Sequence, residues 1–280
     1  MKLSIITPAM RTHYWPKFLE TVRDSCQTIP YEIIFISPFD MPDSLKADNI
    51  IHLKSYAPVP VCIQKGTLLA TGDIVCHAVD DSVFFTNTLD MAVNYFINNM
   101  SYKDALTLTY TENTNNMNIR DKWKIKNISE FNGFSWIDPE WITFVQPMMY
   151  RKRFLELGGF DCSFEYSNHP HHDLAFRMHL DNSNVDVAPF SVSYAYHMAY
   201  DTGDHGPIYL AQDGPDMKKF REKWTNISRP EIFIDYNNYK AYDKRWERRF
   251  KKEYNSYQEM YQDQYSSQRG GYNETHSNWS

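Results

Sequence analysis

The chain has 280 residues, of which 42% are hydrophobic, 16% aromatic and 23% charged. This length and apolar content suffice for one large α/β domain, or two small ones, with a real core. The net charge of −6 argues against a general nucleic-acid or anionic-membrane surface. An anionic ligand would therefore need local help from a metal or a few basic side chains.

The four cysteines are scattered through apolar segments and show neither zinc-ligand spacing nor a disulfide framework. We therefore expect a reducing compartment. The apolar run at the N-terminus is too short for a signal peptide, and no run is long enough to cross a membrane. Together these features predict a cytoplasmic protein without a transmembrane segment.

The first hundred residues alternate short apolar runs with segments of helical periodicity. We predict strands over residues 3–7, 32–37, 49–53 and 74–79, and helices over residues 16–26, 65–70 and 89–100. Strands that alternate with helices build a mostly parallel sheet with helical crossovers. This half of the chain should therefore form an α/β sheet.

The rest of the chain is less regular. We predict strands over residues 105–110, 141–150 and 185–197, and helices over residues 151–157 and 173–180, with a long polar loop over residues 111–136. The pair Gly158-Gly159 should stop the helix before it. From about residue 237 the composition turns to Lys, Arg, Glu, Tyr and Gln, which predicts an amphipathic helix over residues 244–261 and a disordered end.

Two adjacent carboxylates, Asp80 and Asp81, follow the strand predicted over residues 74–79. Ligands of open α/β sheets bind outside the carboxyl ends of the strands. The two carboxylates repel each other, so a positive group should join them. Mg²⁺ or Mn²⁺ carrying a diphosphate fits this requirement. The alternative is a solvated turn in which Asp81 caps the next helix.

Four segments together resemble the glycosyltransferase family 2-like proteins of the GT-A fold, over roughly residues 3–224. They are Leu3–Pro8 with Glu32–Ile36, Gln64–Asp73 with Asp80-Asp81, Met148–Asp161 with Asp173–Arg177, and His197 with Phe220–Trp224. The resemblance implies a GT-A-like α/β fold, in which helices flank a Rossmann-like nucleotide-binding mixed sheet. It implies a nucleotide-sugar-binding half at residues 1–100 and an acceptor-binding half at residues 101–236. A polar C-terminal helix and a disordered tail would occupy residues 237–280.

The same resemblance implies a metal-dependent, inverting glycosyltransferase. The donor would be a nucleotide sugar, with a UDP-sugar favoured, and the acceptor would be the hydroxyl of a glycan or other saccharide. Mg²⁺ or Mn²⁺ on Asp81, completed by His197, would neutralise the leaving diphosphate. Asp173 would act as the base, held charged at the start of a helix, although a plain N-cap is the simpler interpretation of this residue.

Further side chains are candidates for ligand contacts. We predict that the donor is contacted by Arg11, Asp40, Lys65 and Asp80, and the acceptor by His172 and Trp136. A solvated arginine, a turn carboxylate and a core tryptophan are the plainer interpretations of Arg11, Asp40 and Trp136. The cluster His169-Pro170-His171-His172-Asp173 leaves a zinc site open as another alternative.

Two other functions compete with glycosyl transfer. The family commonly has Asp-x-Asp where this chain has Val79-Asp80-Asp81, which motivates a nucleotide-sugar-binding module without catalysis. A nucleotidyltransferase is less favoured, because it would need a Gly-rich, basic phosphate loop after the first strand. The residues at that place, Ala9-Met10-Arg11-Thr12, do not form such a loop.

Overall fold

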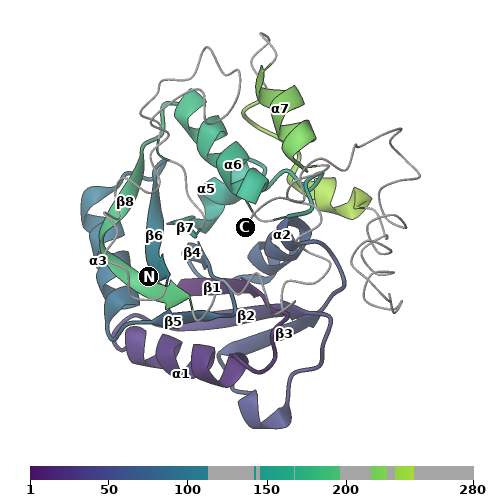
Figure 1. Cartoon of the computed structure of the whole chain (residues 1–280). Helices are drawn as coiled ribbons and strands as arrows, with labels where there is room; N and C mark the ends of the chain where they lie inside the picture. Colours follow the sequence, from purple (N-terminus) through teal and green to yellow (C-terminus); the bar gives the residue numbers. More distant parts are fainter. Residues whose placement is uncertain (113–141, 143–145, 167, 196–215, 226–230, 243–280) are drawn as a thin grey trace, which may run out of the picture. The chain divides into compact units, whose positions relative to one another are not determined.

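An eight-stranded mixed sheet organises the described part of the chain (Figure 1). The computed structural model describes residues 1–112, 142, 146–166, 168–195, 216–225 and 231–242. All of them belong to one unit, Met1–Tyr242, whereas residues 243–280 form a second unit that lies outside the described residues. The predicted helix over residues 244–261 and most of the predicted loop over residues 111–136 therefore also fall outside them.

The order of the strands across the sheet is β3-β2-β1-β4-β7-β6-β8-β5. The strands are β1 (Leu3–Pro8), β2 (Tyr31–Ser37), β3 (Ile50–Lys54), β4 (Ile74–His77), β5 (Ser82–Phe84), β6 (Ala105–Glu112), β7 (Pro147–Tyr150) and β8 (Val185–Ala195). Strands β1 to β4 pair with one another in parallel, and β7 runs antiparallel to both β4 and β6. The predicted parallel sheet is confirmed for β1 to β4.

Helices cover both faces of the sheet. The α-helices are α1 (Trp15–Ser25), α2 (Val59–Leu69), α3 (Thr88–Asn99), α5 (Arg151–Glu156), α6 (Asn168–Leu180) and α7 (Met217–Thr225), and the 3-10 helices are η1 (Asp43–Leu45) and η5 (Tyr236–Ala241). Helices α1 and α3 pack in one hydrophobic cluster, and α2, α5 and α6 pack in another. Figure 1 shows α1 and α2 on opposite sides of β1 and β2.

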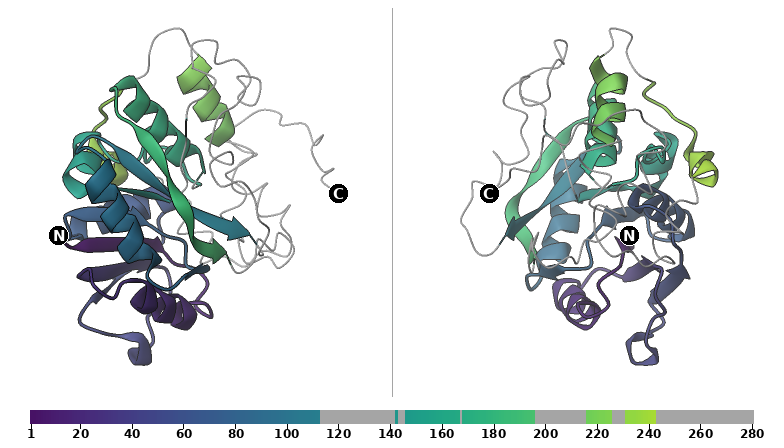
Figure 2. Two further views of the ribbon diagram at one scale, coloured as in Figure 1. Left: turned by 90° about the vertical axis from the view of Figure 1, so that its left-hand side faces the viewer. Right: turned by 45° about the vertical axis from the view of Figure 1, so that its right-hand side comes forward.

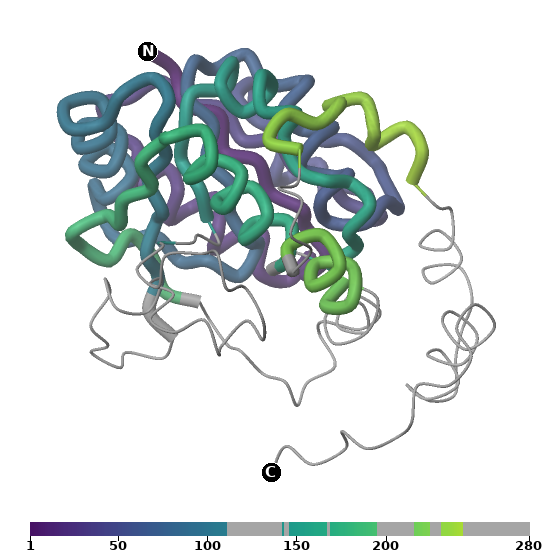
Figure 3. The backbone as a smooth tube through the Cα atoms, turned by 90° about the horizontal axis from the view of Figure 1, so that it is seen from above, coloured from purple at the N-terminus to yellow at the C-terminus, as the bar shows by residue number. Residues whose placement is uncertain are grey.

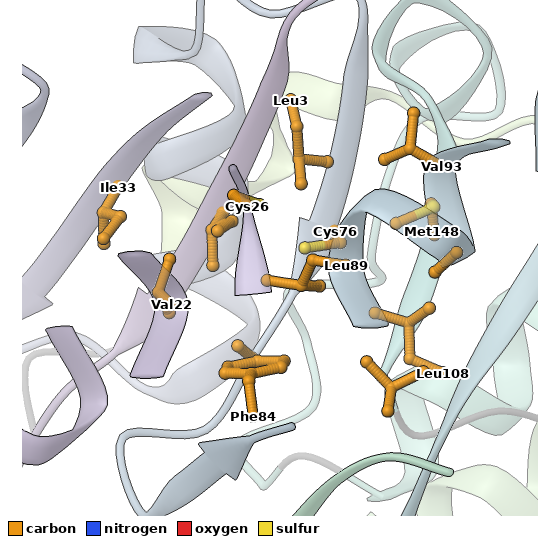
Figure 4. Close-up of a cluster of buried hydrophobic side chains, with 14 of the residues drawn as sticks. Leu3, Val22, Cys26, Ile33, Cys76, Phe84, Leu89, Val93, Leu108 and Met148 are labelled. Atoms are coloured by element: carbon orange, nitrogen blue, oxygen red, sulfur yellow. The ribbon is translucent and has the colours of Figure 1, made fainter. Parts of the chain in front are cut away.

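The cluster under α1 and α3 is built from alternate residues of the central strands. Leu3 of β1 and Cys76 of β4 face the helical residues Val22 and Val93, and all four side chains are fully buried (Figure 4). Such alternation is what a sheet covered on both faces requires. It fixes which side chains remain at the strand ends for a ligand.

The second part of the sheet is built by strands from distant parts of the chain. Strand β8 lies parallel to β6 along most of its length, with register shifts around Thr109, and β5 pairs antiparallel with β8 (Figure 2). Helix α7 lies beside α6, where Trp224 packs on Phe176 with 5.1 Å between their ring centroids (Figure 3). Among the described residues, no helix has the length and apolar character needed to cross a membrane.

Two helices begin earlier than the periodicity predicts. Helix α2 starts at Val59 and α6 starts at Asn168, whereas the sequence predicted starts at residues 65 and 173. Each helix carries a proline near its start, Pro60 or Pro170. A proline is tolerated in a first turn, because the N–H that it lacks has no partner there in any case.

Candidate functional site

The parallel strands bring three loops to one edge of the sheet. Strands β1, β2 and β4 run in the same direction, so their carboxyl ends lie together. The loop after β1 carries Arg11, the loop after β2 carries Asp40, and the turn after β4 carries Asp80 and Asp81. This is the edge at which the sequence predicted a ligand site.

A tight turn between β4 and β5 holds the acidic pair. The amide of Ser82 donates to the carbonyl oxygen of Val79 over 3.0 Å. Within this turn Asp80 is 1% exposed and Asp81 is 4% exposed. The following helix, α3, begins only at Thr88, so the alternative in which Asp81 caps the next helix is wrong. The pair is buried rather than solvated.

The guanidinium of Arg11 joins the two carboxylates. Its Nε donates to Oδ1 of Asp80 over 2.8 Å, and its Nη2 donates to the same oxygen. Its Nη1 donates to Oδ2 of Asp81 over 2.7 Å. The positive group that two adjacent carboxylates require is therefore present within the chain, and Arg11 is not a solvated arginine.

The backbone of the β1–α1 loop holds Asp80 as well. The amides of Met10 and Arg11 donate to its Oδ2 over 2.7 and 2.6 Å. One carboxylate thus accepts bonds from two backbone amides on one oxygen and from the guanidinium on the other. This arrangement ties the end of β4 to the loop after β1.

Burial is the largest influence on the pKa of Asp81. It raises the pKa of Asp81 to about 6, with Arg11 opposing the rise and Asp80 adding to it. Burial by itself lowers the pKa of Arg11, but the two carboxylates outweigh that effect and hold its pKa above the usual range. Arg11 therefore remains charged, whereas burial makes the charged form of Asp81 less favourable than in water.

The donor set fits a hard divalent cation. Carboxylate oxygens are the ligands that Mg²⁺ and Mn²⁺ prefer, and this buried pair already holds one cation, the guanidinium of Arg11. No third His, Cys, Asp or Glu joins Asp80 and Asp81 within the part of the chain that is described. The second predicted ligand, His197, lies outside the described residues.

The other two predicted donor contacts have partners of their own. The carboxylate of Asp40 is exposed and accepts from Nζ of Lys54 over 2.7 Å. Lys65, on α2, donates to Oγ of Ser55 over 3.1 Å and lies 5.0 Å from the ring centroid of Tyr242. Asp40 follows the end of β2, and Lys65 contacts Ser55, which follows the end of β3. The contact of either residue with a nucleotide stays a prediction.

Asp173 lies inside helix α6 and not at its start. The helix begins five residues earlier, at Asn168, so the dipole argument for a charged carboxylate at a helix N-terminus does not hold, and neither does the N-cap interpretation. What holds this carboxylate is a set of side chains instead. Nε of Arg177, one turn further along the helix, donates to its Oδ2 over 2.8 Å.

Helix α7 supplies the other donors to Asp173. Nε1 of Trp224 donates to its Oδ1 over 3.0 Å, and Nζ of Lys223 lies 2.6 Å from the same oxygen. Asp173, Arg177 and Trp224 are fully buried, whereas the side chain of Lys223 is 18% exposed. Lys223 also donates to Asp161 over 3.0 Å, so it bridges α7 to the turn after α5.

The sequence did not predict the three partners of Asp173, which are Arg177, Lys223 and Trp224, as site residues. Lys223 and Trp224 belong to the Phe-x-x-Lys-Trp segment that contributed to the family resemblance. The four-residue spacing from Asp173 to Arg177 is a typical ion-pair spacing on a helix. That spacing could have identified Arg177 in advance, whereas nothing in the sequence pairs α6 with α7.

The histidines before Asp173 point to different neighbours. His171 lies with its ring centroid 5.9 Å from that of His77 and 4.5 Å from that of Phe160. His172 lies 6.3 Å from Phe220, and burial lowers its pKa to about 4, which leaves it neutral at pH 7. The zinc alternative is wrong, because these described residues form no group of three metal-binding side chains.

The acceptor contacts stay predictions. Trp136 lies outside the described residues. His172 is partly buried on α6, one position before Asp173. A neutral imidazole at that place offers hydrogen bonds rather than charge to an acceptor.

No known protein-family model matches this sequence, and no curated protein matches it either. Solved structures do match. A mannosyltransferase from Pyrobaculum calidifontis, solved with GDP-Man and Mn²⁺, aligns with 85% of this chain and 73% of its own, with a TM-score of 0.51 and 14% identity. S. aureus TarS 1-349 aligns with 70% of this chain, with a TM-score of 0.50 and 13% identity.

At such low identities the likeness concerns the fold. The mixed sheet flanked by helices is that of the GT-A glycosyltransferases, as the sequence resemblance implied. This chain spans 60% of the length of the matched TarS chain. The fold alone does not establish an activity, so the activity, substrates and partners of this chain are proposed below.

Proposed function

We propose that this protein is a metal-dependent, inverting glycosyltransferase that moves a sugar from a nucleotide-sugar donor to a hydroxyl of a carbohydrate-type acceptor. The observation that carries the proposal is the buried cluster of Arg11, Asp80 and Asp81 at the carboxyl edge of a GT-A-like sheet. A UDP-sugar is the favoured donor. A cytoplasmic location stays part of the proposal.

The charges of this cluster support the metal requirement. Two carboxylates and one guanidinium leave one net negative charge, which repels the diphosphate of a donor. A divalent cation on the same carboxylates reverses the sign and supplies Lewis-acid stabilisation of the leaving oxygens. We assign Asp81 as a metal ligand, with His197 as a second ligand, and Asp80 as the residue that positions the donor.

The remaining assignments concern the base. We assign to Asp173 the removal of the acceptor's hydroxyl proton, which inversion requires. Two of its three donors, Arg177 and Trp224, are fully buried, so the side of Lys223 is the most open approach to this carboxylate. An acceptor hydroxyl that reaches Asp173 must therefore displace Lys223.

The experiment is hydrolysis of UDP- and GDP-sugars with Mn²⁺, with and without EDTA, by the wild type and Asp81→Asn. We expect metal-dependent release of one nucleotide, reduced about 100-fold or more in the variant. Asp43→Asn is the matched control, because its carboxylate is exposed on η1 and pairs only with Lys46 in the described contacts. Release that survives both EDTA and Asp81→Asn would refute the metal assignment.

One observation favours the non-catalytic binding module as a second candidate. Asp173 is fully buried and accepts from three donors, as a structural carboxylate does. If Asp173 is the catalytic base, Asp173→Asn should fold and bind a nucleotide sugar but should not transfer the sugar. A purely structural role predicts a loss of about 3–5 kcal/mol in the free energy of unfolding, measured with denaturant.

A further inference from the structure

The guanidinium of Arg11 binds carboxylate oxygens that a divalent cation would also bind. Three of its nitrogens donate to Oδ1 of Asp80 and Oδ2 of Asp81. The remaining oxygen of Asp80 already accepts two backbone amides. A divalent cation held by both carboxylates would therefore compete with the guanidinium for these oxygens.

The backbone around Arg11 is held independently of its side chain. Its amide and that of Met10 donate to Asp80, and its carbonyl oxygen accepts from the amide of Tyr14 over 2.9 Å. The side chain itself is 12% exposed. A change of side-chain rotamer would free the carboxylates while the loop and Asp80 stay in place.

We infer that Arg11 is a built-in counter-ion that competes with the divalent cation for Asp80 and Asp81, and that its displaced guanidinium then binds the donor diphosphate. This inference rests on the metal site of the proposed function. Without the divalent cation, Arg11 neutralises part of a buried charge that is costly to leave alone. With the cation present, two positive groups beside the same oxygens repel each other.

The displaced guanidinium would bind the phosphate groups of the donor. Its five N–H donors match the oxygens of phosphate groups, and bidentate contacts with phosphate are strong. The loop after β1 ends at the same sheet edge as the acidic turn, so the released side chain stays beside the site. Arg11 is thus both a competitor of the metal and a positioning residue for the diphosphate.

The first experiment measures Mn²⁺ binding to the full chain by calorimetry, without nucleotide. Arg11→Gln removes the competing charge but keeps a hydrogen-bonding side chain, so we expect Mn²⁺ to bind at least tenfold more tightly than to the wild type. Arg23→Gln, at a 70% exposed side chain on α1, is the matched control and should bind Mn²⁺ like the wild type. Equal affinities for wild type and Arg11→Gln would overturn the inference and leave the metal site standing.

Arg11→Gln should change nucleotide affinity in the direction opposite to its effect on Mn²⁺ affinity. With Mn²⁺ saturating, UDP and GDP should bind Arg11→Gln at least tenfold more weakly than the wild type, because the phosphate contact is lost. A merely structural role for Arg11 would weaken both metal and nucleotide binding, which would contradict the inference. Absence of Mn²⁺ binding in every variant would instead refute the metal site of the proposed function, and the inference with it.

A second variant and a direct probe cover the case in which Arg11→Gln does not fold. Arg11→Lys keeps one charge but lacks the fork that spans both carboxylates, so it should compete less well and bind Mn²⁺ more tightly than the wild type. In the wild type, the NMR signal of the Arg11 Nε–H, assigned through Arg11→Lys, should shift when the diamagnetic Mg²⁺ is added. An Nε–H signal that does not respond to saturating Mg²⁺ would contradict the displacement.

Discussion

Glu32 shows how one buried carboxylate secures the edge of the sheet opposite the candidate site. It accepts from Nζ of Lys2, Oγ of Ser4 and the amide of Thr71, each over 2.6 Å. Burial would raise its pKa, but these donors outweigh burial and lower the pKa to about 2. The first, second and fourth strands are tied together through this one side chain.

The low pKa of Glu32 makes its contribution to stability depend on pH. Because the folded pKa lies below the ordinary value of 4.5, the contribution is complete above pH 4.5 and is lost as the pH falls toward 2. We expect Glu32→Gln to lower the free energy of unfolding by about 1.5–3 kcal/mol at pH 7, and by about half as much at pH 3. Denaturant unfolding at the two pH values measures this.

Glu20→Gln serves as the control for that comparison, because Glu20 is 49% exposed and pairs only with Lys17 in the described contacts. Its effect should stay within about 0.5 kcal/mol at both pH values. Equal losses for Glu32→Gln at pH 7 and pH 3 would mean that charge plays no part in the contribution of Glu32.

At the scale of elements, the turn between α2 and β4 depends on close backbone contact. A Cβ on Gly72 would lie 2.5 Å from Oγ of Ser4 and 2.7 Å from the carbonyl oxygen of Lys2. These distances are shorter than van der Waals contact, so the turn needs a residue without a side chain. Gly72 thereby lets β4 begin directly beside β1. This pairing places Asp80 and Asp81, which follow β4, next to the loop that carries Arg11.

We expect Gly72→Ala to cost about 1–3 kcal/mol of the free energy of unfolding, as overpacking does. Adding Ser4→Ala should not restore stability, because the carbonyl oxygen of Lys2 is backbone and stays where it is. Thermal unfolding of the single and double variants measures both effects. A stable Gly72→Ala would show that β4 can shift away from β1 without loss.

The sequence predicted some elements because their signals are local. The apolar runs of β1, β2 and β4 and the Gly158-Gly159 stop of α5 need no knowledge of other segments, and both glycines do adopt positive φ values. The predicted start of α6 was five residues late, because the apolar side chains of this helix begin only at Leu174, and the polar first turn with Pro170 carries no such signal. Strand β5 was not predicted, since three residues carry too little periodicity to be recognised.

At the scale of the whole molecule, the candidate site was only partly predictable. That Arg11, Asp80 and Asp81 would meet follows from parallel strands, whose carboxyl ends share an edge. That Arg11 would bind both carboxylates depends on side-chain geometry, which no spacing in the sequence reveals. The burial of Asp173 depends on α7, a helix fifty residues further along the chain, so the pattern around Asp173 gave no sign of it.

The described sheet, its helices and the acidic cluster all belong to the unit Met1–Tyr242. We therefore expect a chain that ends after Tyr242 to unfold cooperatively and to keep the donor hydrolysis and Mn²⁺ affinity of the full chain. Calorimetry and the hydrolysis assay measure these properties. Loss of cooperative unfolding in the shortened chain would show that residues 243–280 are needed for folding.

The position of β7 has a consequence for synthesis on the ribosome. This strand, Pro147–Tyr150, lies between β4 and β6, although both of those strands precede it in the chain. Until it emerges, β4 and β6 each present an unpaired edge, and such edges pair readily with other chains. Nascent chains shorter than about 150 residues should therefore depend on chaperones, and a stall just before β7 should promote aggregation.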